Sequence, residues 1–216
     1  IYGIPGQTPD IWKRDMNQII KLNPEHISAY SLTVEKGTGL FQMVKSKKIN
    51  MPKNDESAEW FSCTQEHLSH SGFIPYEISN FSKPGKECRH NLHYWNIEPY
   101  IGFGPSAHSF DGEKRWNNVR SLDQYMEKIN IGFSPISISE SLTPIQKMNE
   151  KIGFGLRLND GIDLIKFPEK FREQLINNVK QNQKKWNGYI NQNNSRVRLK
   201  KDGFAFADAI AVDLMF

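Results

Sequence analysis

The chain has 216 residues, 38% of them hydrophobic and 24% charged, which is ordinary for a globular protein of one or two domains. Its formal net charge of +4 is mild and spread along the chain, so charge alone does not indicate a nucleic-acid partner. Two cysteines cannot form a disulfide framework, which favours a reducing compartment. No apolar run approaches the roughly 20 residues of a membrane-spanning helix, and no signal-peptide pattern is present. We therefore expect a cytoplasmic protein without a membrane span.

Residues 1–4 look like the end of a strand, and the chain does not begin with methionine, so we expect a piece of a longer protein. Thr8 as N-cap and Pro9 at the first helical position predict a helix, which the Asn-Pro pair at 23–24 should end. Residues 26–34 then predict a second strand. A strand, a helix and a strand form a βαβ unit with a right-handed crossover.

Residues 35–52 look like a loop-rich connection, and a second helix is predicted from about residue 54 to Gly72. A third strand is predicted over 73–78, followed by a loop that Pro84 and Gly85 interrupt. These patterns predict an α/β fold with parallel strands, outer helices and ligand groups on the loops that follow the strands.

Asp111 and Gly112 predict a hairpin turn between a strand ending at Phe110 and a strand over 114–117. From Ser121 onward capped helices and short strands predict a small helical, winged-helix-like domain. We place the boundary between the two parts at residue 118. The expected helices begin near Ser121, Thr143, Pro168 and Gly203, and the expected strands are 186–190 and 196–199.

The loop after the third predicted strand is the main candidate site, because a surface loop has no folding reason to carry so many rings. Imidazoles beside an amide and aromatic rings suit a flat, partly apolar ligand such as heme, with one nitrogen left for a metal. A purely structural loop is an equally weighted alternative, and a zinc site with Cys88 lacks a fourth ligand. The candidate residues are His90, Asn91, His93, Tyr94 and Trp95.

Three other positions are weaker candidates. The turn with Gly6 and Gln7 precedes a helix N-terminus, which favours an anionic group, although a plain tight turn explains it equally well. His108 follows a glycine-rich stretch and is either a ligand contact or a histidine bonded within a strand. Glu77 lies in an apolar strand and must face a cavity or pair with a cation, for which Arg89 is the candidate.

Six basic residues near the expected wing could contact nucleic acid, but a solvated face is the favoured interpretation and a nucleic-acid partner is not expected. These residues are Lys184, Lys185, Arg196, Arg198, Lys200 and Lys201.

Several segments together resemble the radical S-adenosylmethionine (SAM) family of oxygen-independent coproporphyrinogen III oxidase-like proteins, and within it the branch of HemW-type heme chaperones. The segments are 1–8, 26–35, 76–81, 83–85, 89–95 and 102–110. The resemblance implies the second part of a partial (β/α) barrel of six strands, followed by the family's accessory C-terminal domain.

The resemblance also implies site residues. The family's His-Asn-x-x-Tyr-Trp pattern, associated with heme binding, falls on His90, Asn91, Tyr94 and Trp95. Contacts to S-adenosylmethionine are expected on the side of Gly6, Gln7, Thr33 and His108, with Glu77 and Arg89 as further pocket residues.

One departure from the family is large. The family holds a [4Fe-4S] cluster with three cysteines in a CxxxCxxC pattern near its N-terminus, and Cys63 and Cys88 cannot form that pattern. We therefore expect the cluster, and the S-adenosylmethionine it binds, in the full protein, with no catalytic residue and no activity in this chain alone. A barrel cut partway exposes a strand edge near Ile1, which favours dimerisation.

The resemblance implies two functions. The first is a heme chaperone that binds heme or porphyrin and delivers heme to acceptor proteins. The alternative is oxidative decarboxylation of coproporphyrinogen III, whose propionates would need cationic partners such as Arg89 and Arg115.

Overall fold

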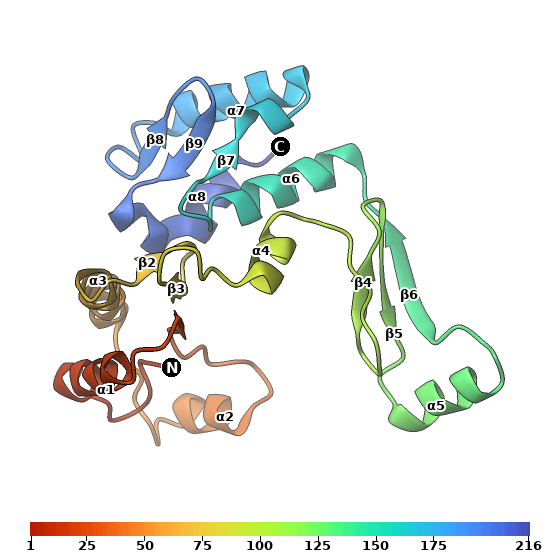
Figure 1. Ribbon diagram of the computed structural model, residues 1–216, viewed down its shortest axis with the longest axis horizontal. Coiled ribbons are helices and arrows are strands. Elements are labelled where there is room, and N and C mark those ends of the chain that lie inside the picture. Colours follow the sequence, from red (N-terminus) through yellow and green to blue (C-terminus); the bar gives the residue numbers. More distant parts are fainter.

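The computed structural model describes the backbone of residues 1–216 and all side chains except those of residues 54 and 55. Figure 1 shows three groups of elements. The helices α1 (Pro9–Lys21), α2 (Gly39–Lys45) and α3 (Asn54–His70) surround a small sheet, a second sheet with α5 (Leu122–Asn130) stands apart on one side, and a helical unit carries another small sheet. No helix of the described chain combines the length and the apolar character needed to cross a membrane.

The N-terminal group begins as the sequence predicts. The hydroxyl of Thr8 accepts a hydrogen bond from the backbone of Ile11 at 3.3 Å and caps the first helix. A parallel bridge joins Tyr2 to Ser31, so the predicted strand–helix–strand arrangement is present in minimal form. The elements are α1 (Pro9–Lys21), β1 (His26–Ser28), α2 (Gly39–Lys45), α3 (Asn54–His70), β2 (Ile74–Pro75) and β3 (Asn80–Ser82).

The sheet of this group differs from the prediction. Its order is β1-β3-β2 and both pairings are antiparallel, so the expectation of parallel strands was wrong for this sheet. The chain reverses after β2, because the Glu77 carboxylate accepts the backbone N–H of Ser79 at 3.0 Å and holds a turn. The predicted strand over 73–78 is therefore one arm of a hairpin. The strand predicted over 26–34 is only β1, and the predicted loop over 35–52 contains α2.

The core of the N-terminal group is aromatic. Trp60, Phe73 and Phe81 are buried between α3 and the sheet, and Tyr2 packs on Trp12 with ring centroids 5.2 Å apart. Burial raises the pKa of Tyr2 to about 12. This packing holds the β2–β3 hairpin in place, and the segment with the candidate site residues comes directly after that hairpin in the chain.

The middle group is built on the predicted hairpin. The Asp111 carboxylate accepts the backbone N–H groups of Glu113 and Lys114, which confirms the turn. The sequence did not predict the third strand of this sheet. This strand follows residue 118, the expected boundary between the two parts, and pairs antiparallel with the second arm of the hairpin. The elements are β4 (His108–Phe110), β5 (Lys114–Asn118), α5 (Leu122–Asn130) and β6 (Ile136–Ser141).

The C-terminal group packs three helices against an antiparallel sheet of order β7-β9-β8. Thr143 and Gln146 form the predicted capping box. The strand predicted at 186–190 lies later, since residues 184–189 form a turn and β8 begins at Ile190. The elements are α6 (Pro144–Gly155), β7 (Ile162–Asp163), η1 (Leu164–Lys166), α7 (Glu169–Asn182), β8 (Ile190–Gln192), β9 (Arg196–Leu199), η2 (Lys201–Phe206) and α8 (Ala207–Leu214).

Candidate functional site

The segment with the candidate rings is a helix, α4 (Arg89–Trp95), and not the predicted loop. Backbone hydrogen bonds run from Leu92 N–H to the Cys88 carbonyl at 3.0 Å and from Asn96 N–H to the Leu92 carbonyl at 2.8 Å. This helix has only two turns, so its sequence shows no helical periodicity of apolar residues. A helix this short is stabilised by packing against other parts of the chain. Its geometry decides which rings share a face, because residues four apart lie one above the other.

The outward face of α4 carries an aromatic cluster. His90 and Tyr94 meet edge to face, with ring centroids 4.9 Å apart, and Tyr94 meets Tyr100 in the same way at 4.7 Å. Both His90 and Tyr94 are exposed. Among the described residues no hydrogen bond reaches the His90 ring nitrogens, so this imidazole is free to bind a ligand.

His93 is placed differently. Its Nε2 atom lies 2.8 Å from the Pro99 carbonyl oxygen, and its Nδ1 atom lies 2.7 Å from a carboxylate oxygen of Glu98. Both ring nitrogens are engaged, so in this geometry His93 offers no free nitrogen to a metal. His93 instead ties the end of α4 to the segment that follows it.

The remaining candidates of α4 point inward. The Asn91 amide donates to the Tyr76 hydroxyl at 3.2 Å, and that hydroxyl lies 2.8 Å from Nε2 of His26. Trp95 packs against Phe154, with ring centroids 5.7 Å apart, in the C-terminal group. The five ring and amide residues therefore occupy two faces of α4. They do not converge on a single hollow.

Glu77 is buried, with 2% of its surface exposed, and its carboxylate accepts hydrogen bonds from the Ser79 backbone and the Asn80 side chain. The predicted pair with Arg89 is not formed, since Arg89 is exposed on α4. Burial raises the pKa of Glu77, and the nearby positive charge of Arg157 opposes this only in part. Glu77 thus holds the β2–β3 turn.

The residues predicted on the S-adenosylmethionine side lie in two places. Gly6 and Gln7 form a turn in which the Gln7 amide oxygen accepts the Gly3 N–H at 2.8 Å. Thr33 is exposed two residues after Ser31, whose bridge to Tyr2 brings it beside that turn. His108 is exposed in β4, within the sheet that stands apart in Figure 1.

The two cysteines do not fit an iron–sulfur cluster. Cys63 is exposed on α3, and Cys88 precedes α4. The described residues contain no group of three or more His, Cys, Asp or Glu side chains that could hold a metal ion.

Three members of the C-terminal basic cluster are engaged with acidic groups. Lys185 pairs with Asp213 at 2.6 Å and Lys201 with Glu66 at 3.0 Å. Arg196 lies 4.0 Å from the Asp160 carboxylate and donates to the Asp160 backbone carbonyl at 3.1 Å. These contacts agree with a solvated, paired face.

Sequence analysis missed one member of the outward cluster, Tyr100. The turn at residues 96–99 brings it back beside α4, and Ile97 in this turn adopts a φ of +57°. A β-branched residue rarely adopts that conformation, so nothing in the sequence predicted the turn.

The fold is shared with a solved enzyme. The structure titled "Coproporphyrinogen III oxidase (HemN) from Escherichia coli is a Radical SAM enzyme" superposes with a TM-score of 0.75 over 99% of this chain and 53% of that chain, at 17% identity. Residues 142–206 match the family described as the HemN C-terminal domain. Fold and C-terminal unit together define an α/β protein of the HemN type.

Curated relatives narrow this class. "Heme chaperone HemW" of Mycobacterium tuberculosis is 32% identical over 215 residues, which is 100% of this chain and 54% of that relative. "Heme chaperone HemW" of Bacillus subtilis is 33% identical over 81% of this chain and 46% of that relative. The chain belongs to the HemN/HemW family of radical S-adenosylmethionine proteins. It spans about half the length of the curated relatives it matches.

Proposed function

We propose that this chain is part of a heme-binding radical S-adenosylmethionine protein that acts as a heme chaperone. The observation that carries the proposal is the exposed His90 imidazole beside Tyr94 and Tyr100. An imidazole nitrogen is a common axial ligand of heme iron, and rings meeting edge to face offer an apolar wall to a porphyrin. The relatives named heme chaperones, at 32% and 33% identity, support this choice of ligand.

Within this proposal the five candidate residues have different roles. His90 and Tyr94 contact the heme, with His90 as the iron ligand. His93 and Asn91 position α4, because their polar groups bond to Pro99, Glu98 and Tyr76 in the protein. Trp95 anchors the helix on the C-terminal group.

We further propose that S-adenosylmethionine and its [4Fe-4S] cluster belong to the full protein. The two cysteines of this chain do not fit the cluster, and its described residues contain no group of three or more possible metal ligands. Gly6, Gln7 and Thr33 lie at neighbouring strand ends and would face the cofactor as one group. His108, in a separate sheet, would contribute from another side. Glu77 and Arg89 would act as supporting groups, with Glu77 shaping the turn below.

The architecture that accompanies this function is also a proposal. The N-terminal group would form the second part of a partial (β/α) barrel, completed by further chain, and an exposed edge at Ile1 would allow pairing with another copy. We propose the division into 1–118 and 119–216, with the sheet of β4, β5 and β6 connecting the two parts. The whole protein would pass heme to acceptor proteins in the cytoplasm.

The test is a titration of this chain with hemin. Wild type is expected to show a shifted Soret band that His90→Ala weakens, with an affinity loss of about tenfold or more for a lost axial bond. His93→Ala is the matched control, one turn away on the same helix, and should keep the band position. Equal affinity and equal spectra for all three proteins would contradict the proposal.

A second candidate function is oxygen-independent coproporphyrinogen III oxidation, favoured by the structural match to HemN. Arg115 is a poor candidate for a propionate, because its guanidinium already makes two hydrogen bonds to Glu150 at 2.8 and 3.0 Å. Arg89 is exposed and remains the candidate cation. Anaerobic turnover of coproporphyrinogen III by the full-length protein would favour this function over the chaperone.

A further inference from the structure

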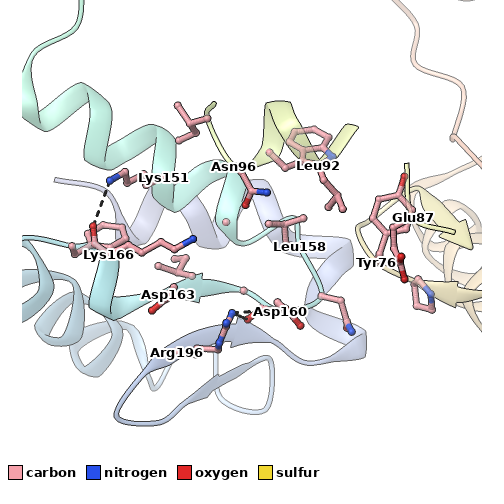
Figure 2. Close-up of a pocket in the computed structure, with 18 of the residues that line it drawn as sticks. Tyr76, Glu87, Leu92, Asn96, Lys151, Leu158, Asp160, Asp163, Lys166 and Arg196 are labelled. Atoms are coloured by element: carbon pink, nitrogen blue, oxygen red, sulfur yellow. Dashed lines mark hydrogen bonds and ion pairs between the residues drawn. The ribbon is translucent and has the colours of Figure 1, made fainter. Parts of the chain in front are cut away.

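A pocket of about 490 Å³ lies between α4 and the C-terminal group. Figure 2 shows Leu92 of α4 on one side of it and Leu158, which follows α6, on the other. Trp95 also lines the pocket, and Phe167 is a buried part of its wall. Its volume is within the range of pockets that bind small organic ligands, and much of its lining is apolar.

The pocket is separate from the heme face proposed above. Leu92 and Trp95 are three residues apart and share the face of α4 that lines the pocket, whereas His90 and Tyr94 do not line it. A ligand in the pocket would therefore lie on the opposite side of α4 from the His90 imidazole. Ligand binding in this pocket is therefore independent of heme binding at His90.

Two lysines line one end of the pocket. The Lys151 ammonium lies 3.4 Å from the Lys166 carbonyl oxygen and 5.8 Å from the centroid of the Phe167 ring. Neither lysine forms an ion pair among the described residues. Burial lowers the pKa of Lys151, and the positive charges of Lys166 and Lys147 lower it further. The neighbouring Lys147, by contrast, is paired with Glu113.

The acidic residues that line the pocket already have partners. Asp160 faces Arg196, with 4.0 Å between its carboxylate oxygen and the guanidinium. Asp163 caps η1 by accepting the Ile165 N–H at 3.0 Å. Glu87 accepts the Gly85 N–H at 3.3 Å. Each pocket carboxylate therefore has a hydrogen-bond or ion-pair partner, whereas the ammonium groups of Lys151 and Lys166 form no ion pair in the described residues and are available to an anionic ligand.

We propose that this pocket binds an amphipathic organic acid, whose carboxylate is held by Lys151 and Lys166 and whose apolar body packs on Leu92, Trp95 and Leu158. A carboxylate between the two lysines would form ion pairs that neither lysine now makes, and for Lys151 it would replace the long 3.4 Å hydrogen bond to the Lys166 carbonyl oxygen. The same chemistry is offered by a tetrapyrrole, through its propionates, and by a smaller aryl carboxylic acid.

Three probes separate these sources. Metal-free protoporphyrin IX has propionates but no iron, so His90 cannot ligate it. Its dimethyl ester keeps the ring system and loses both charges. Biphenyl-4-carboxylate is a small acid with an apolar body. Affinities would be measured by fluorescence titration and calorimetry on wild type, Lys151→Met, Lys166→Met and His90→Ala. Lys170→Met on the exposed surface of α7 is the matched control, and thermal unfolding verifies that each variant is folded.

We expect at least one of the two acids to bind wild type, with an affinity that falls about tenfold in Lys151→Met and less in the more exposed Lys166→Met. Lys170→Met should bind as wild type does. Lysine-dependent porphyrin binding that the dimethyl ester lacks assigns the pocket to a tetrapyrrole, and lysine-dependent binding of biphenyl-4-carboxylate alone assigns it to smaller acids. The proposal is overturned if neither acid binds, or if both lysine variants are folded and bind with unchanged affinity. Loss of hemin binding in His90→Ala is a separate result that bears only on the heme proposal.

Discussion

The Nδ1 atom of His93 lies 2.7 Å from a carboxylate oxygen of Glu98, five residues further along the chain. With Nε2 bonded to the Pro99 carbonyl, the imidazole closes the turn that follows α4. This turn returns Tyr100 to the helix, where it meets Tyr94. His93 therefore shapes the outward cluster without offering a nitrogen to it.

His93→Ala should weaken the turn after α4. We expect the free energy of unfolding to fall by about 1 kcal/mol, the usual net contribution of one hydrogen bond, because Glu98 and His93 are both partly exposed. Urea unfolding measures this change. An unchanged stability together with a lost Soret band would mean that His93, and not His90, binds the iron.

Glu77→Gln should change how stability depends on pH. Burial raises the folded-state pKa of Glu77 above its ordinary value of 4.5. The folded state then holds more protons than the unfolded state between these two values, so this group's stabilisation is complete below 4.5 and is lost as pH rises through the folded pKa. A glutamine does not titrate and keeps the acceptor oxygen that Ser79 uses.

The measurement is urea unfolding of both proteins from about pH 4 to about pH 7, the window in which a raised carboxyl pKa acts. Stability of Glu77→Gln relative to wild type should increase across this range. Parallel curves would show that Glu77 titrates normally in the folded protein.

The N-terminal group shows what its sequence could and could not predict. Thr8 and Pro9 predict the start of α1 correctly, because helix capping depends only on residues that are close in the sequence. The direction of β3 relative to β1 is set instead by the turn at Glu77. The sequence did not predict this turn, because Glu77 lies within the predicted strand over 73–78. Strand pairing depends on which chain reversals the whole fold stabilises, and an apolar run of six residues does not contain that information.

The sequence indicated which residues form the candidate site, but it did not predict how their side chains are arranged in space. The sequence indicated His90 and Tyr94 as site residues. Because the segment was predicted to be a loop, the prediction could not specify which side chains lie on the same face. Helical geometry then separates these two residues from Trp95, which packs on Phe154 far along the chain. Contacts between distant segments, such as the pocket that Leu92 and Leu158 share, leave no short-range pattern.

The Arg115–Glu150 pair should be structural. Both side chains are mostly buried and make two parallel hydrogen bonds. A double-mutant cycle with Arg115→Met and Glu150→Gln is expected to give a coupling free energy of about 1 kcal/mol or more. Porphyrin affinity should stay within about twofold of wild type in Arg115→Met, because the Arg115 guanidinium is engaged by Glu150 and not by a ligand. A selective loss of porphyrin binding, with stability kept, would instead assign Arg115 to a propionate.

Leu175→Ala should destabilise the C-terminal group. Leu175 is 0% exposed in the cluster between α6, α7 and α8. Removing its side chain leaves a cavity, so we expect a loss of about 2–5 kcal/mol. Ile165→Ala, with 73% of its surface exposed, is the control and should change stability by less than about 0.5 kcal/mol. Similar losses in both variants by thermal unfolding would place the core elsewhere.

The most direct test of the heme proposal is chemical rescue of His90→Gly. If the His90 imidazole ligates the iron, this variant should bind hemin weakly, and added free imidazole should restore the wild-type Soret position by filling the vacated place. The same titration of His93→Gly should need no imidazole. A His90→Gly spectrum that matches wild type before imidazole is added would contradict the account.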